Sequence, residues 1–114
     1  MSKRKGDDRL DEMVKILKLL ADKTRLTLLD ILGDGERCVC DLVEALQTTQ
    51  PNISQHLRKL REAGLVQETR RGHWAYYKLT VDHLPYVKAT LEAVPTTEAR
   101  RKLQKPSTDS SCCN

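Results

Sequence analysis

The sequence predicts a mainly α-helical domain that carries one small β-hairpin, and three observations indicate this fold class. Apolar residues recur at helical spacing over most of residues 7–63. The period then changes to two over LVQETRRGHWAYYKL, where apolar and polar residues alternate around an Arg-Gly-His turn. Helical spacing returns after residue 80 and ends at Pro95.

The chain has 114 residues, which suits one domain. We expect that domain to span residues 7–99, after an N-terminal tail of residues 1–6. From residue 100 the chain becomes polar and basic and ends in KPSTDSSCCN, so residues 100–114 are expected to form a flexible, cysteine-containing tail. No apolar run approaches the roughly 20 residues of a membrane span, and no apolar segment follows the basic start as in a signal peptide. We therefore expect a cytoplasmic protein with no membrane partner.

Five helices are expected, four before the hairpin and one after it. Their apolar stripes and stop signals place them over residues 10–21, 24–32, 39–46, 50–63 and 84–94. The second helix stops at Gly33. The fourth follows a threonine pair suited to capping and stops at Gly64, which is a good residue for the position just after a helix.

The third and fourth of these helices are joined by a tight turn, and the fourth is polar and basic opposite its apolar stripe. Such a pair is a helix-turn-helix, and the basic hairpin that follows makes it winged. Gln and Asn pair well with adenine, and Arg with guanine, in the major groove. The residues expected to contact DNA are Gln50, Asn52, Ser54, Gln55, His56, Arg58, Lys59, Arg70, Arg71 and His73.

The charge distribution also favours a polyanionic partner. Residues 50–78 hold six Lys or Arg and two Asp or Glu, a surplus of +4 that equals the net charge of the whole chain. A solvated basic surface is the alternative, but one stretch carries the entire surplus. Because a single recognition helix binds weakly, we expect a homodimer on an inverted repeat of double-stranded operator DNA. The wide apolar stripes of the first and last helices are the expected dimer surface.

Four cysteines occur as a CxC motif, Cys38 and Cys40, and as the adjacent pair Cys112 and Cys113. In a reducing compartment thiolates are expected rather than disulfides, and thiolates are soft ligands for trivalent arsenic, cadmium, lead or zinc. Trivalent arsenic prefers three sulfurs, so Cys112 or Cys113, from the same or the partner subunit, is the candidate third ligand. Buried structural cysteines and an idle tail pair are the alternatives.

The spacing of the CxC motif suggests how an ion affects DNA binding. Residues i and i+2 lie about 200° apart around an α-helix, so two such thiols face opposite sides. Binding one ion through Cys38 and Cys40 is therefore expected to strain or unwind the first turn of the third helix. That helix packs behind the DNA-reading helix, so ion binding and DNA binding should oppose each other.

The segments LADKTRLTLLDIL, ERCVCDLVEAL, TTQPNISQHLRKLREAGLV and RRGHWAYYKL resemble the ArsR/SmtB family of bacterial metal- and metalloid-sensing repressors, over about residues 10–94. The resemblance implies a dimeric repressor that occupies a promoter palindrome and leaves it on binding a metal ion. In the arsenic-responsive branch it implies that Cys38 and Cys40 bind trivalent arsenic or antimony. The best-known motif of that branch has a further cysteine where this chain has Val43.

The sequence thus predicts a DNA-binding repressor, not an enzyme, that needs no permanent cofactor and dissociates from its operator on binding arsenite or antimonite. Two alternatives keep the fold: a repressor switched by thiol oxidation, and one that responds to cadmium, lead or zinc. A third alternative, from another class, is a thiol-based metal-transfer or redox protein. No glycine-rich nucleotide loop or catalytic His–Cys arrangement in the sequence supports that class.

Overall fold

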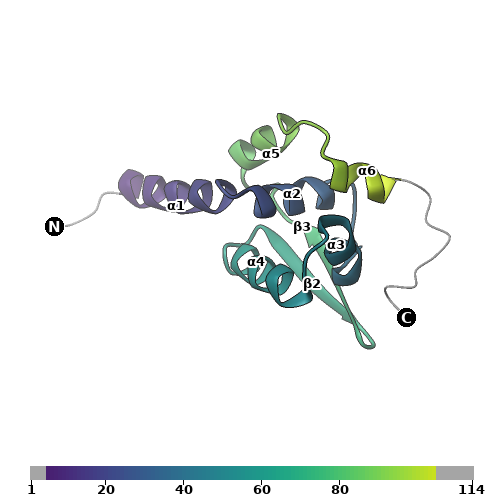
Figure 1. Cartoon of the computed structure of the whole chain (residues 1–114). Helices are drawn as coiled ribbons and strands as arrows, with labels where there is room; N and C mark the ends of the chain where they lie inside the picture. Colours follow the sequence, from purple (N-terminus) through teal and green to yellow (C-terminus); the bar gives the residue numbers. More distant parts are fainter. Residues whose placement is uncertain (1–4, 105–114) are drawn as a thin grey trace.

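The computed structural model of the protein describes residues 5–104, with side chains from residue 8 to residue 103. In chain order its elements are α1 (Lys5–Leu20), α2 (Lys23–Leu32), β1 (Arg37–Cys38), α3 (Val39–Leu46), α4 (Gln50–Glu62), β2 (Val66–Arg71), β3 (Trp74–Leu79), α5 (Pro85–Glu92) and α6 (Glu98–Gln104) (Figure 1). The expected α-helical domain with a hairpin wing is confirmed. No helix within these residues is long and apolar enough to cross a membrane.

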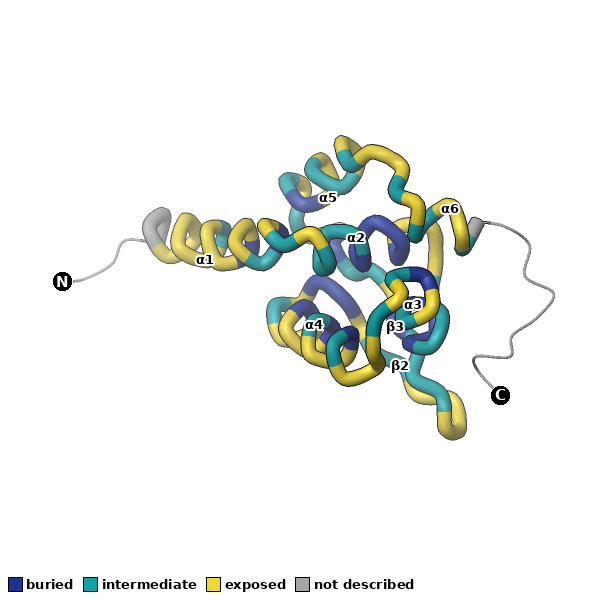
Figure 2. The backbone as a smooth tube through the Cα atoms, in the orientation of Figure 1, coloured by how far each residue is buried: buried dark blue, intermediate teal, exposed yellow. Residues whose placement is uncertain are grey.

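The core forms around α2, which contacts α1, α4, α5, α6 and β3. Its second half is buried, including the fully buried Leu28 and Leu29 (Figure 2). α4 contributes its apolar stripe to the same core, and its three largest members, Ile53, Leu57 and Leu60, are fully buried. Each such side chain stabilises the fold by roughly 1.5–3 kcal/mol relative to leaving it exposed. This burial fixes which side of α4 remains available for binding.

The boundaries of α4 are set by the local sequence, as expected. Thr49 is the N-cap, and its Oγ1 accepts a hydrogen bond from the backbone N–H of Asn52 at 3.3 Å. At the other end Gly64 has a φ of 79°, a left-handed conformation that glycine adopts without a Cβ penalty. The N–H of Leu65 then donates to the carbonyl of Leu60 at 2.9 Å, which closes the helix in a Schellman arrangement.

The wing is an antiparallel hairpin whose register runs from Val66 opposite Leu79 to Arg71 opposite Trp74. Its two-residue turn begins at Gly72, where φ is 65°. A positive φ at the first turn residue matches the right-handed twist of the paired strands, and glycine permits it. The short strand β1 pairs with β3 on the other edge, with Cys38 opposite Tyr76. Two residues carry no detectable period, so the sequence did not predict β1.

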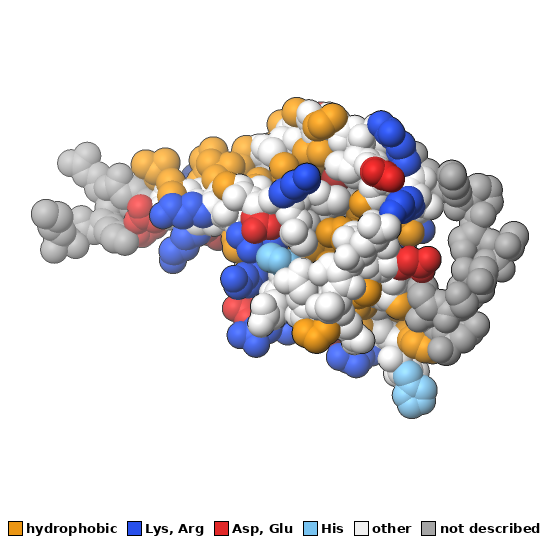
Figure 3. All heavy atoms as spheres, in the orientation of Figure 1, with side chains coloured by type: hydrophobic (Ala, Val, Ile, Leu, Met, Phe, Trp, Pro, Cys, Tyr) orange, Lys and Arg blue, Asp and Glu red, His pale blue; other side chains and the backbone are white. Residues whose placement is uncertain are grey.

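Helix α1 extends away from the rest of the molecule and is exposed along most of its length (Figure 2). Ile16 and Leu20 are buried against the core. In contrast, Leu10, Val14 and Leu17 remain 57%, 40% and 38% exposed. Hydrophobic side chains gather along the upper edge of α1 in Figure 3. The broad apolar stripe therefore divides into a core-facing part and an unpartnered part.

Helices extend a few residues beyond the expected ends of the domain at each terminus. The helix α1 already begins at Lys5, within the segment assigned to a tail. The other tail was expected to start at residue 100, but residues 98–104 form α6. Ala99 and Leu103 of α6 pack against the core, and Arg100 forms ion pairs with α2 and the loop after it. These contacts are made with residues far away in the sequence, so the polar composition of this segment did not reveal them.

Candidate nucleic-acid interface and thiol site

The outer surface of α4 is open to solvent because its apolar stripe is buried. Among the predicted DNA-contacting residues, those exposed on this helix are Gln50, Ser54, Gln55, Arg58 and Lys59. Arg58 donates to Glu62 at 3.2 Å, with both side chains mostly exposed. Exposed pairs of this kind stabilise by about 0–1 kcal/mol, so Glu62 holds the Arg58 side chain only weakly. Lys and Arg side chains lie over this part of the molecule in Figure 3.

Two predicted contacts on α4, Asn52 and His56, are half-buried rather than exposed. The side-chain amide of Asn52 donates to Oγ1 of Thr48 at 3.0 Å, within the turn that precedes α4. Arg25 of α2 donates to Nδ1 of His56 at 3.3 Å. Both residues border the buried stripe and help to fix α4 in place, because their polar groups already have partners in the protein.

The hairpin holds the remaining predicted contacts. His73 in the turn and Arg70 beside it are exposed. Arg71 is more constrained: its Nη1 lies 2.8 Å from a carboxylate oxygen of Glu36, and its guanidinium carbon lies 4.8 Å from the ring centroid of Tyr76. These two interactions hold Arg71 against Glu36, which precedes β1, and against Tyr76 of β3.

A polar network forms the base of the hairpin and includes residues that the sequence did not predict. The Tyr77 hydroxyl donates to Glu68 at 2.5 Å, and Arg61 of α4 donates to the same carboxylate at 3.3 Å. Burial, and then this hydrogen bond, raise the pKa of Tyr77 to about 12, so the phenol stays neutral and donates. The network ties the recognition helix to the wing. Glu68 and Arg70 are two residues apart in β2 and so lie on one side of the strand, which is the sequence pattern that could have indicated this network.

The two sulfur atoms of the CxC motif lie close together in this structure. Cys38 is the N-cap of α3 with extended backbone (φ −72°, ψ 147°), whereas Cys40 lies in the first turn of the helix. Their Sγ atoms are 2.8 Å apart. The expectation that the two thiols face opposite sides of one helix is therefore wrong. The 200° separation applies to two helical residues, and Cys38 belongs to β1 instead.

Little movement separates this arrangement from an ion-binding one. Tetrahedral zinc sites have metal–sulfur bonds of about 2.3 Å, which places neighbouring sulfurs about 3.8 Å apart. Two sulfurs bound to one such ion would thus lie about 1 Å farther apart than the sulfurs of Cys38 and Cys40 do here. Cys38 is buried and has a free thiol.

The CxC cysteines and several of the predicted DNA-contacting residues share one groove, a cavity of about 700 Å³ between the start of α3, the outer surface of α4 and the hairpin. Residues from both predicted sets line it: Cys38, Cys40, Ser54, Arg58, Arg70 and His73. Gln50 also lines this groove, whereas Gln55, Lys59 and Arg71 do not. An ion at the CxC motif and a DNA backbone would therefore occupy neighbouring parts of one surface.

The other two predicted ligands, Cys112 and Cys113, lie outside the described residues. Within the part of the chain whose side chains are described, His, Cys, Asp and Glu form no group of three or more that could hold a metal ion. That part contributes two sulfurs, and a three-sulfur site needs one more.

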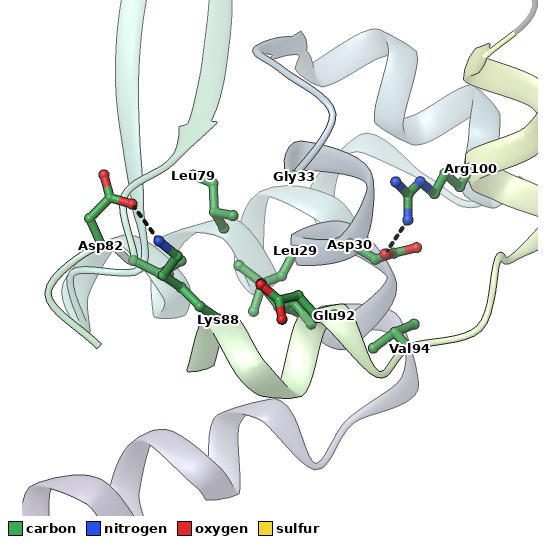
Figure 4. A pocket seen from close by; sticks show the side chains of 11 residues that line it. Leu29, Asp30, Gly33, Leu79, Asp82, Lys88, Glu92, Val94 and Arg100 are labelled. Atoms are coloured by element: carbon green, nitrogen blue, oxygen red, sulfur yellow. Dashed lines mark hydrogen bonds and ion pairs between the residues drawn. The ribbon is translucent and has the colours of Figure 1, made fainter. Parts of the chain in front are cut away.

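A second cavity, of about 470 Å³, lies against α2, β3 and α5 and is bordered by Arg100 of α6 (Figure 4). It contains the buried carboxylate of Asp30 and the ion pair between Asp82 and Lys88, whose charged atoms are 3.4 Å apart. None of the predicted site residues lines it.

Comparison with known proteins agrees with this fold. Residues 22–68 match the family described as bacterial regulatory protein, arsR family. The chain is 48% identical over 81 residues to the arsenic resistance transcriptional regulator ArsR1 of Pseudomonas putida, an alignment that covers 69% of this chain and 62% of that protein. It thus spans less than two thirds of that relative. It is 38% identical over 87 residues to the arsenical resistance operon repressor of Staphylococcus xylosus, covering 76% of this chain and 84% of the relative.

Among solved structures, the chain is similar to a homodimeric winged helix-turn-helix DNA-binding domain from Mycobacterium bovis. The TM-score is 0.69 at 28% identity, and the similarity covers 81% of this chain and 85% of that chain. The helix-turn-helix, the wing and the CxC motif of this chain occur together within one fold, and the matched regions include α2, α3 and α4. The protein therefore belongs to the arsR family of bacterial regulatory proteins.

Proposed function

We propose that the protein is a transcriptional repressor, which binds an inverted-repeat operator as a homodimer and releases it when its thiolates bind trivalent arsenic or antimony. The observation that carries the proposal is the shared groove, in which the paired sulfurs of Cys38 and Cys40 lie beside the exposed side of α4 and the wing. One surface then serves both ligands.

DNA binding is supported by the position of α4. Its exposed Gln50, Gln55 and Arg58 have the donor and acceptor groups that read base edges in the major groove, and the N-terminal end of such a helix usually reaches the bases. The exposed cations of the wing suit phosphates or a narrow minor groove. Dimer formation is supported by the unpartnered apolar side of α1 and by the homodimeric relative.

The inducer is proposed from sulfur chemistry together with the relatives that are described as arsenic or arsenical resistance regulators. When both are reduced, Cys38 and Cys40 provide two soft ligands whose sulfurs lie close together. Cys112 or Cys113 provides the third sulfur. No permanent cofactor takes part, and the bound metalloid acts only as a regulatory ligand.

Ion binding opposes DNA binding through β1 and α3. Cys38 pairs with Tyr76 of the wing strand β3, and Cys40 lies on α3, which packs against α4. An ion that joins the two sulfurs therefore acts at once on the wing and on the support of the recognition helix. If the ion prefers the arrangement that DNA disfavours, the two affinities are coupled, typically by 1–3 kcal/mol.

A DNA-release assay tests this proposal. Fluorescent operator DNA bound to the protein is titrated with arsenite in the presence of a strong reductant. The wild type should release the DNA, whereas Cys38→Ser and Cys40→Ser should bind DNA normally and fail to release it. Parallel titrations with cadmium, lead and zinc test the alternative that the repressor responds to one of these metals instead of arsenite. Release by oxidant alone, with no response to arsenite under reductant, would contradict the proposal and favour a thiol-redox switch.

A further inference from the structure

The carboxylate of Glu68 in β2 links three elements around the groove, because it accepts hydrogen bonds from Tyr77 of β3 and from Arg61 of α4. These three residues are called the Glu68 network below. We propose that this network carries the effect of an ion at the CxC motif to the recognition helix and the wing, an inference that rests on the proposed function. Its members are positioning residues, which act through the spacing of α4 and the wing.

The Glu68 network is tightly held. Glu68 lies directly opposite Tyr77 in the hairpin register, and the buried Tyr77 donates its hydroxyl hydrogen across this pair at 2.5 Å. Arg61 donates to the other carboxylate oxygen at 3.3 Å, and Nε of Arg70 lies 3.8 Å from that oxygen. The Glu68 side chain is itself mostly buried. One carboxylate therefore joins both strands of the wing to the recognition helix.

The strand β1 connects this network to the thiols. In the register between β1 and the central strand β3, Arg37 lies opposite Tyr77 and Cys38 lies opposite Tyr76. Tyr77 thus has the strand of Cys38 on one side and the strand that carries the carboxylate on the other. The network lines the same groove as Cys38 and Cys40. One strand pairing and one side chain therefore separate Cys38 from the carboxylate of Glu68.

The positions of the sulfurs give the direction of the effect. The sulfurs of Cys38 and Cys40 lie 2.8 Å apart, whereas sulfurs that share one ion in a tetrahedral zinc site lie about 3.8 Å apart. An ion between them displaces Cys38, and β1 with it, out of the arrangement in which Tyr77 reaches Glu68. The network then opposes ion binding and favours the spacing of α4 and the wing that suits DNA. Breaking it should weaken operator binding and, reciprocally, tighten arsenite binding.

Three single substitutions break the network at different points. Tyr77→Phe removes only the donor hydroxyl, Glu68→Gln removes the charge that holds the arginine, and Arg61→Gln breaks the network from its exposed end. The operator Kd of each full-length variant is measured by fluorescence anisotropy under a strong reductant, with and without saturating arsenite. The ratio of the two Kd values is the coupling. Arsenite affinity in the absence of DNA is measured by isothermal titration.

Two matched controls make the same chemical changes outside the network. Glu62→Gln removes the carboxylate of the exposed ion pair that Glu62 forms with Arg58 on α4, which is an equal change of charge. Tyr76→Phe removes a hydroxyl from the neighbouring residue of β3 and keeps the ring that faces Arg71. Both controls should keep the coupling ratio of the wild type.

We expect arsenite to raise the operator Kd of the wild type about 5–150-fold, the usual range of allosteric coupling. In the three network variants this ratio should fall toward one, by at least about fivefold. The same variants should bind operator more weakly without arsenite and bind arsenite severalfold more tightly without DNA. Damage to the wing alone would weaken DNA binding but would not tighten arsenite binding, so the second measurement separates positioning from simple destabilisation.

An unchanged coupling ratio in the network variants would overturn the proposal, and so would an equal fall in the two controls. Weaker operator binding with unchanged arsenite affinity would assign the network to the stability of the wing alone, which also overturns it. If arsenite does not release the wild type from its operator, the proposed function itself fails. That outcome is seen in the wild type alone, so it is distinguishable from the others.

Discussion

At the residue scale, the guanidinium of Arg71 already has two partners within the protein, which any DNA phosphate would have to displace. It pairs with Glu36 and lies over the ring of Tyr76, although it stands near the wing tip, where a cation can contact a DNA phosphate. The ion pair is partly exposed, with side-chain exposures of 58% and 26% for Arg71 and Glu36. Its contribution is therefore about 0–1 kcal/mol, which a phosphate contact can exceed.

We expect Glu36→Gln to raise operator affinity by up to about fivefold, because DNA no longer has to displace a carboxylate from Arg71. The measurement is a fluorescence-anisotropy titration over a range of salt concentrations. In an Arg71→Ala background the effect of Glu36→Gln should shrink, and Arg71→Ala alone should reduce the salt slope by about one. A loss of affinity on Glu36→Gln would mean that Glu36 orients Arg71 for DNA instead of competing for it.

At the scale of the element, the junction between α1 and α2 depends on one N-cap. Asp22 has extended backbone and accepts a hydrogen bond from the N–H of Arg25 at 3.0 Å. Arg25 in turn donates to the carbonyl of Leu19 at 2.7 Å and reaches His56 of α4. The start of α2 is thus the point where α1, α2 and the recognition helix are held together.

Asp22→Ala should reduce the free energy of unfolding by about 1 kcal/mol, the usual effect of losing an N-cap. The hydrogen bond from Arg25 lowers the pKa of Asp22 below its unfolded value of 3.8. Its charged form therefore stabilises the fold above about pH 3.8, and this contribution is lost as the pH falls through the lower folded-state pKa.

Denaturant unfolding at fixed protomer concentration checks this, because association would otherwise change the apparent stability. Asp22→Asn is the matched control: it keeps a capping oxygen but does not titrate. The difference in stability between wild type and Asp22→Asn should diminish below pH 3.8. A difference that does not change with pH would rule out this role for the carboxylate.

At the scale of the whole molecule, α1 has an unpartnered apolar side formed by Leu10, Val14 and Leu17. A helix that extends from the core with exposed Leu and Val gains little from the fold of its own subunit. Covering this side with a second subunit would bury it and would place two recognition helices on one DNA molecule. Dimer formation and operator recognition are therefore expected to depend on the same helix.

Val14→Glu should shift the protein toward monomers in sedimentation at micromolar concentration and should weaken operator binding. The cost to the fold of the monomer should be small, because the residue is already 40% exposed. Lys15→Gln changes the net charge by the same amount at an exposed neighbouring position and should leave the dimer intact. An unchanged dimer dissociation constant for Val14→Glu would exclude α1 from the interface.

The sequence determined those parts of the protein that depend on neighbours along the chain. The start of α4 lies where the capping threonine predicts, and the hairpin turns at Gly72 as the alternation of the flanking residues indicates. The Leu and Ile positions of α4 define its buried stripe, and hence its exposed side. Local hydrogen bonds and periodicity suffice for these features because each is set within a few residues.

Only the tertiary structure decided what depends on residues far apart. The strand β1 exists because β3 lies beside it, and its backbone brings the two CxC sulfurs together where helical geometry alone predicted separation. The segment EARRKLQ is too polar to indicate a packed helix, yet α6 is fixed by Arg100 to Asp30, 70 residues away. Likewise Glu36 meets Arg71 only through the fold. Charge pairs and strand edges leave no periodic signal, because either partner can lie anywhere in the chain.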